Sequence, residues 1–125
     1  VPMVLNGPPQ AAGLLGGVAD AVVHLSGIPG LIHATRRARA VLGIDSGPTH
    51  LAAATDVPIV TIFGPSKESR WRPIRPENVT ILRGADCPPE CAWGMCTADL
   101  KCVMNVTVDD MLRAAGKYLA TDLAS

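Results

Sequence analysis

The stretch V-L-G-I-D-S-G-P-T-H-L-A-A-A-T-D-V-P-I-V-T-I-F-G-P, residues 41–65, decides the fold of this chain. Its first residues, Val41 to Ile44, form an apolar run typical of a buried strand, and Pro58 to Phe63 form a second. Between them, the small residues from Leu51 to Thr55 favour a helix. A strand, a polar turn, a helix and a second strand make the unit from which parallel sheets are built.

Similar signals recur on both sides of this stretch. Further short apolar runs predict strands over Met3 to Asn6, Ala21 to Leu25 and Asn78 to Arg83. Helices are predicted over Ala11 to Ala19, Gly30 to Arg39 and Val108 to Ala120. The alternation predicts an α/β fold, a Rossmann-like doubly wound parallel sheet that forms one domain over residues 1–125.

The last predicted helix is amphipathic. Its apolar spacing predicts that Met111, Leu112, Ala115 and Leu119 face inward. Thr107 is expected to cap its N-terminus.

Composition excludes several classes of function. Eleven basic and eleven acidic residues give a net charge of zero, so no basic field attracts nucleic acid. No apolar run approaches the ~18 residues that span a bilayer. The N-terminus lacks the basic region of a signal peptide, and the chain starts without Met. We expect a piece of a longer, cytoplasmic protein.

Polar and turn-forming residues fill the connection between the strand at 41–44 and the following helix. Ligands of open α/β sheets bind outside the carboxyl ends of the strands. The first N–H groups of a helix attract phosphate there. We therefore expect a phosphorylated ligand to bind at Asp45, Ser46, Gly47, Pro48, Thr49 and His50. The alternative is a helix capped by Asp45, with His50 half-buried and without a ligand.

Each side chain of this turn has a distinct chemical use. Asp45 can hold a ribose hydroxyl, orient a neighbour or cap the helix. Gly47 lets a phosphate come close to the backbone, and Ser46 and Thr49 offer hydroxyl groups. His50 can contact phosphate as imidazolium or donate a proton.

Two longer motifs resemble one family. D-S-G-P-T-H-L-A-A-A at 45–54, followed by V-P-I-V-T-I-F-G-P-S at 57–66, is similar to the ADP-heptose:lipopolysaccharide heptosyltransferases, glycosyltransferase family 9. The cysteine-bearing segment and V-M-N-V-T-V-D-D-M-L at 103–112 look like the end of that family's domain. The resemblance is good over about residues 40–120 and loose over 1–39.

The resemblance implies a GT-B enzyme, in which two Rossmann-like domains face a cleft. This chain would be the C-terminal half, which binds the nucleotide sugar, and the acceptor-binding N-terminal domain would be absent. Asp45, Ser46, Gly47 and His50 would then bind the diphosphate and sugar of ADP-heptose.

Two further positions are implied only by the resemblance. Ser26 falls where the family meets the adenine, and Gln10 falls near its usual acidic residue for the ribose. Glutamine at that position is a departure, because it binds a hydroxyl more weakly than a carboxylate does.

The implied reaction is an inverting transfer of heptose to the lipopolysaccharide inner core, at the inner face of the inner membrane. His50 would stabilise the leaving diphosphate, and no cofactor or metal would take part. The family's general base is an aspartate of the N-terminal domain, so we expect these 125 residues to bind donor without transferring sugar. Two alternatives stay open: a nucleotide or nucleotide-sugar binding module that stands alone, and a GT-B enzyme with another donor.

Two other groups of residues have open interpretations. The four cysteines of the predicted loop over Asp86 to Asn105 could hold zinc, form disulfides or remain free thiols: Cys87, Cys91, Cys96 and Cys102. A basic loop follows Gly64-Pro65 and could contact phosphate or simply face solvent: Lys67, Arg70, Arg72 and Arg75.

Overall fold

The computed structural model describes residues 3–6, 21–24, 27–64, 72–74, 77–84 and 101–123. The chain divides into two compact units, residues 1–34 and 35–125, which we describe separately. The helix expected over Ala11 to Ala19 lies outside the described residues.

The first unit contains two parallel strands. Strand β1 (Met3–Asn6) pairs with β2 (Ala21–His24), and Met3 lies opposite Ala21 in the register. Helix α1 (Ile28–Arg37) begins in this unit. Both strands fall within one residue of the predicted bounds, because each is a short apolar run.

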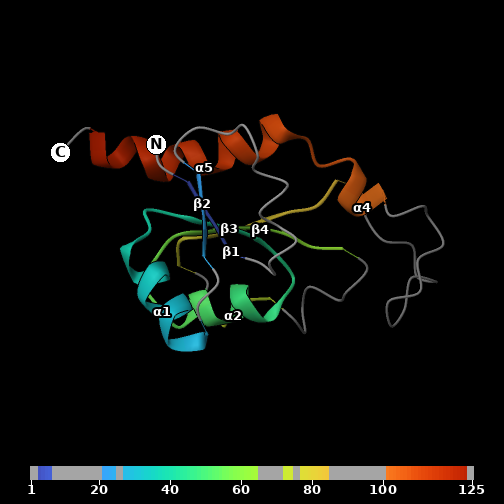
Figure 1. The fold of residues 1–125 in the computed structure, drawn as a ribbon. Helices are drawn as coiled ribbons and strands as arrows, with labels where there is room; N and C mark the ends of the chain where they lie inside the picture. The colour runs from blue at the N-terminus through green and yellow to red at the C-terminus, as the bar shows by residue number, and fades with distance from the viewer. Residues whose placement is uncertain are drawn as a thin grey trace. The chain divides into compact units, whose positions relative to one another are not determined.

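The second unit contains a three-stranded parallel sheet. Its order is β3 (Val41–Ile44), β4 (Ile59–Ile62) and β5 (Val79–Leu82), and Ile59 lies opposite both Val41 and Val79. Figure 1 shows α2 (Gly47–Ala53) and α5 (Val108–Leu123) on opposite sides of this sheet. A parallel sheet flanked by helices confirms the predicted Rossmann-like α/β fold.

The core of the second unit lies where α2 crosses the sheet. Ala52 and Ala53 of α2 pack with Ile59, and Val41 and Val79 close the cluster from the neighbouring strands. Side chains directly opposite each other in a sheet share a face, so this register brings three apolar side chains under the helix. The small alanines let the helix lie close to the strands.

The other face of the sheet meets α5. The Thr80 hydroxyl of β5 and the Tyr118 hydroxyl of α5 lie 3.0 Å apart and form a hydrogen bond. Ala115 is buried, but Leu112, predicted to face inward, is 60% exposed. The prediction for Leu112 was wrong because one helical step turns it by about 100° from Met111, away from the sheet.

The start of α5 carries the predicted cap. The Thr107 N–H donates to Asp110 Oδ2 at 2.9 Å, and the Asp110 N–H donates to Thr107 Oγ1 at 3.1 Å. The backbone hydrogen bond from Thr107, followed by the bond with its hydroxyl, lowers the pKa of Asp110 from its ordinary 3.8. Because the folded pKa is depressed, this stabilisation is present above pH 3.8 and is lost as pH falls further.

Helix bounds differ more from prediction than strand bounds do. Helix α2 starts at Gly47 rather than Leu51, so Pro48 and His50 belong to the helix itself. The short helix α4 (Lys101–Met104) lies in a segment that was predicted as loop.

A glycine at the end of β5 brings α4 close to the sheet. The Gly84 N–H donates to the Cys102 carbonyl at 2.7 Å. A Cβ added at Gly84 would lie 2.6 Å from Asn105 Cβ and 2.8 Å from backbone atoms of Asn105 and Val106. This contact allows no side chain at position 84.

We expect Gly84→Ala to lower the free energy of unfolding by about 1–3 kcal/mol, because the clash is with backbone that cannot rotate away. Gly116→Ala is the matched control: nothing lies within 4 Å of a Cβ there, and alanine favours the helix. Urea denaturation of both variants measures the difference. Equal stabilities would show that the close approach at Gly84 is absent in solution.

Candidate functional site

The predicted site lies where β3 ends and α2 begins. Asp45 and Ser46 connect the two elements, and Ser46 takes an extended conformation with φ −157° and ψ 166° before the helix starts at Gly47. Pro48 stands in the first turn of the helix, where its fixed φ suits the helical backbone. Ser46, rather than Asp45, holds the N-cap position, and its side chain makes no capping hydrogen bond.

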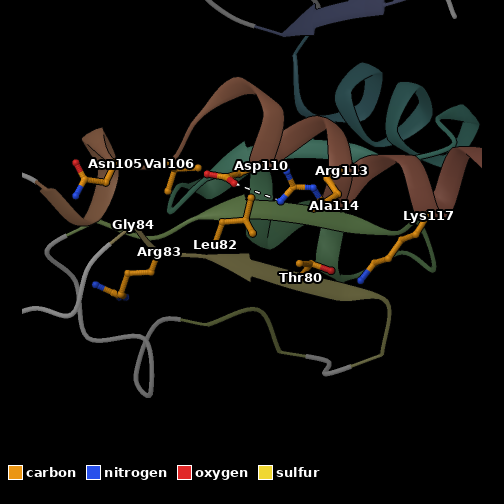
Figure 2. A pocket seen from close by; sticks show the side chains of 10 residues that line it. All are labelled: Thr80, Leu82, Arg83, Gly84, Asn105, Val106, Asp110, Arg113, Ala114 and Lys117. Carbon is orange, nitrogen blue, oxygen red and sulfur yellow. Dashed lines mark ion pairs between the residues drawn. The ribbon is translucent and has the colours of Figure 1, made fainter.

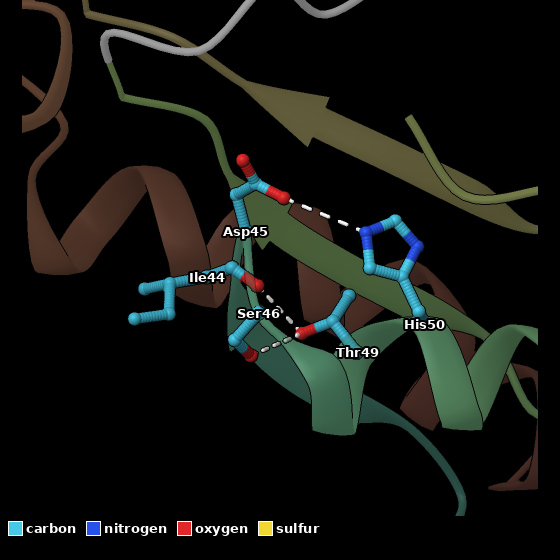
Figure 3. Close-up of polar contacts among 5 residues, drawn as sticks. All are labelled: Ile44, Asp45, Ser46, Thr49 and His50. Atoms are coloured by element: carbon cyan, nitrogen blue, oxygen red, sulfur yellow. Dashed lines mark hydrogen bonds and ion pairs between the residues drawn. The ribbon is translucent and has the colours of Figure 1, made fainter. Parts of the chain in front are cut away.

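Thr49 fixes the shape of the turn from inside. Its side chain is buried, and Oγ1 donates to the Ile44 carbonyl at 2.6 Å (Figure 3). The Thr49 hydroxyl has a single proton, which it donates to the Ile44 carbonyl. In the 3.4 Å contact between Thr49 Oγ1 and Ser46 Oγ, Ser46 is therefore the donor. Thr49 therefore shapes the site, and its hydroxyl is already committed to the chain.

Asp45 and His50 meet above this turn. His50 Nε2 lies 3.5 Å from Asp45 Oδ1, and Figure 3 shows the other ring nitrogen directed away from the carboxylate. The side chains are 40% and 20% exposed, so solvent or a ligand reaches both. Here the structure brings together the two predicted residues with the most useful chemistry.

Two glycines shape the approach to the pair. A Cβ at Gly43 would overlap Thr49 Oγ1, so β3 and α2 can come this close only with glycine at position 43. At Gly47 nothing lies within 4 Å of an added Cβ, which leaves open space beside the first turn of the helix. Gly43 was not predicted as part of the site, although a glycine inside an apolar strand signals a close backbone approach.

Arg83 connects the ends of the two following strands. Its Nη1 donates to the Gly64 carbonyl at 2.9 Å, and Gly64 is buried. Arg83 was not predicted, because its hydrogen bond joins residues far apart in the chain. Of the basic loop, the structure describes only Arg72, which is exposed.

Other predicted residues are only partly described. Gln10 and Ser26 lie outside the described residues, as do three of the four cysteines. Cys102 is a buried free thiol. Within the described part of the chain, no three His, Cys, Asp or Glu side chains gather in a group that could hold a metal ion.

A groove of about 430 Å³ lies elsewhere, between β5 and α5 (Figure 2). Its basic side chains already have partners in the chain. Arg113 Nη1 lies 3.8 Å from Asp110 Oδ1, and Lys117 Nζ lies 4.9 Å from the centre of the Tyr118 ring. The groove includes none of residues 45–50, so it is separate from the predicted site at the turn.

The parallel sheet and the polar turn at the end of β3 define a Rossmann-like α/β protein. The family model described as "Glycosyltransferase family 9 (heptosyltransferase)" matches residues 22–96, which include the whole turn. The chain therefore belongs to glycosyltransferase family 9, as the motifs predicted.

Two curated relatives carry the same name. Lipopolysaccharide heptosyltransferase 3 of Escherichia coli is 42% identical over 36 residues, which are 29% of this chain and 11% of that protein. The protein so named in Escherichia coli strain K12 is 27% identical over 84 residues, 67% of this chain and 24% of that protein. The chain thus matches at most about a quarter of the length of either relative.

A solved structure shares the fold. The crystal structure of the glycosyl transferase family 9 protein from Veillonella parvula DSM 2008 aligns with a TM-score of 0.76 and 20% identity. The alignment covers 96% of this chain and 37% of that one. Within the described residues, no helix combines the length and the apolar character that crossing a membrane requires.

Proposed function

We propose that this chain is the donor-binding part of a glycosyltransferase that moves heptose from ADP-heptose to the lipopolysaccharide inner core. The observation that carries the proposal is the Asp45–His50 pair at the end of β3, inside the region matched by the family. The names of the curated relatives support the choice of heptose and lipopolysaccharide.

The chemistry of the turn suits a nucleoside diphosphate sugar. When protonated, His50 offers positive charge to a phosphate oxygen, and the open space at Gly47 admits the phosphate to the backbone. The partly exposed Asp45 carboxylate can accept hydrogen bonds from sugar hydroxyls. In this proposal Gln10 binds the ribose and Ser26 lies at the adenine.

The proposed step is an inverting displacement. The acceptor hydroxyl oxygen bonds to the anomeric carbon of the heptose, and the bond from that carbon to the diphosphate oxygen breaks. The hydroxyl proton passes to a base in an acceptor domain outside these 125 residues. His50 stabilises the charge that grows on the departing diphosphate. The reaction would take place in the cytoplasm, at the inner face of the inner membrane.

Nucleotide binding tests the donor. By calorimetry on the complete polypeptide, we expect ADP and ADP-heptose to bind at least about tenfold more tightly than UDP and UDP-GlcNAc, a preference of about 1.4 kcal/mol. Binding of uridine nucleotides alone would contradict the heptosyl proposal and favour a GT-B enzyme with another donor. Nucleotide binding without transfer by the complete polypeptide would identify a binding module without catalysis.

A further inference from the structure

The middle strand of the three-stranded sheet carries a buried hydroxyl group that lacks a partner. Thr61 of β4 is 0% exposed, and its Oγ1 forms no hydrogen bond with any of the described residues. Burial of this kind is unfavourable, because the hydroxyl loses its bonds to water and gains none in return. A valine has nearly the same shape without this cost, so packing alone does not explain a threonine here.

Thr61 lies on the face of the sheet that α2 covers. Ile59, two residues earlier in β4, packs against Ala52 and Ala53 of α2. Side chains two positions apart in a strand point to the same face, so Thr61 also points toward α2. In the register, Thr61 lies opposite Gly43 of β3. Its hydroxyl is therefore beside a position that has no side chain of its own.

The side chain of Thr49 fills the space above Gly43. A Cβ added at Gly43 would overlap Thr49 Oγ1 and would lie 3.6 Å from Thr49 Cβ. Because neighbouring strands are about 4.8 Å apart, the side chains of Thr49 and Thr61 stand about one strand spacing from each other. Rotation of Thr61 about its Cα–Cβ bond turns its hydroxyl toward Thr49 or away from it. Two buried threonines are thus neighbours under the turn between β3 and α2.

Thr49 accepts one weak hydrogen bond that a ligand could replace. Its hydroxyl donates to the Ile44 carbonyl and accepts from Ser46 Oγ at 3.4 Å (Figure 3). The second distance is long, since hydroxyl groups usually bond at about 2.7–2.8 Å. Ser46 is half-buried and belongs to the turn proposed for the phosphate. A charged phosphate oxygen is a stronger acceptor than a hydroxyl oxygen, so it would draw the Ser46 proton away from Thr49.

We propose that Thr61 is a positioning residue of the donor site, and that it donates to Thr49 when the phosphate takes the Ser46 hydroxyl. Thr49 then has a donor in both states, and Thr61 gains its hydrogen bond only when the donor binds. Part of the affinity for the donor therefore comes from pairing a hydroxyl that folding leaves unpaired. This inference rests on the proposed function, because the phosphate is the group that releases Ser46.

Thr61→Val in the complete polypeptide tests the role in binding. We expect the Kd for ADP, measured by calorimetry, to rise about tenfold, because the bound state loses a hydrogen bond. The unfolding temperature without ligand should not fall, because the substitution removes an unpaired buried hydroxyl. An unchanged Kd would overturn the proposal. A lower unfolding temperature would also overturn it, since Thr61 would then be paired before the donor binds.

Thr80→Val is the matched control. It is the same substitution in the neighbouring strand β5, but the Thr80 hydroxyl lies 3.0 Å from the Tyr118 hydroxyl and is hydrogen-bonded to it. Loss of this bond should lower the unfolding temperature and leave the Kd for ADP unchanged. An equal rise in Kd for both variants would assign the effect to the sheet as a whole and contradict a specific role of Thr61.

Ser46→Ala separates the proposed exchange from simple packing. Without the Ser46 hydroxyl, Thr61 can pair with Thr49 before any ligand arrives. In that background Thr61→Val should lower the unfolding temperature and should no longer change the Kd for ADP. If Thr61 acts by packing alone, Thr61→Val has the same effects with and without the Ser46 hydroxyl, and this result would refute the exchange.

The same proteins distinguish failure of this inference from failure of the proposed function. If the wild type binds no ADP, but Thr61→Val lowers the unfolding temperature only in the Ser46→Ala background, the donor proposal fails and the exchange at Thr49 stands. If the wild type binds ADP and Thr61→Val acts equally in both backgrounds, the donor proposal stands and Thr61 has no positioning role.

Discussion

Replacing His50 with alanine should reduce kcat/KM for sugar transfer by the complete enzyme about 100- to 1,000-fold, the usual effect of removing a group that stabilises developing charge. In the proposed reaction, negative charge grows on the diphosphate as its bond to the anomeric carbon breaks. The imidazole stands at the mouth of the turn, 3.5 Å from Asp45, and is partly open to a ligand. Alanine leaves no group there to meet that charge.

Stability should change little in this variant. The His50 side chain is half-exposed, so its loss opens no buried cavity, and we expect a change within about 0.5 kcal/mol. His33→Ala is the matched control, since His33 is an exposed histidine of α1. A His50→Ala enzyme with normal kcat/KM, or a His33→Ala enzyme with an equal loss, would contradict the proposed role.

Asp45→Ala adds a test of coupling. Because Asp45 and His50 touch, their substitutions should not be additive, and the double variant should lose less than the product of the two single losses. Steady-state kinetics on the wild type, the two single variants and the double variant gives the kcat/KM values for this comparison. Fully additive losses would show that the contact between Asp45 and His50 has no part in transfer.

Replacing Gly43 with valine should lower the free energy of unfolding by about 3 kcal/mol or more, the largest stability effect that we expect in this chain. A Cβ at Gly43 overlaps Thr49 Oγ1, and this hydroxyl is held by its hydrogen bond to the Ile44 carbonyl. Relief of the clash requires Thr49 to leave that bond or α2 to move away from β3. Either change also distorts the Asp45–His50 turn.

Gly47→Ala is the control that separates folding from binding. Nothing lies near a Cβ at Gly47, so we expect the stability of this variant to stay close to wild type. Its affinity for ADP should nevertheless fall, because the methyl group occupies the space proposed for the phosphate. Denaturation and calorimetry on both variants check the two claims. A Gly43→Val protein with wild-type stability would contradict the close packing of α2 on β3. Unchanged ADP affinity of the Gly47→Ala protein would contradict the proposed position of the phosphate.

The strands were predictable because each is a continuous apolar run. Met3–Asn6 and Val41–Ile44 have the predicted bounds, and the other three strands differ only by end residues. Short continuous apolar runs are typical of strands in parallel sheets, and they can be recognised from neighbouring residues alone. Helix starts were less predictable, since α2 begins with glycine and proline, which are poor helix formers inside a helix but acceptable in its first turn.

The site was predictable where it is local and unpredictable where it depends on distant contacts. Asp45 and His50 were both predicted as site residues, because they flank the same polar turn at the carboxyl end of a strand. The restriction at Gly43 comes from a close approach of α2 to β3, which the pattern of residues 41–50 does not reveal. The Arg83 bond to Gly64 likewise depends on the pairing of β4 with β5.

The most direct measurement is a crystal structure of the complete polypeptide with ADP bound. Our account predicts diphosphate oxygens against the backbone at Gly47 and within hydrogen-bonding distance of His50, beside the Asp45 carboxylate. A nucleotide seated elsewhere, with the end of β3 unchanged and without ligand, would contradict it.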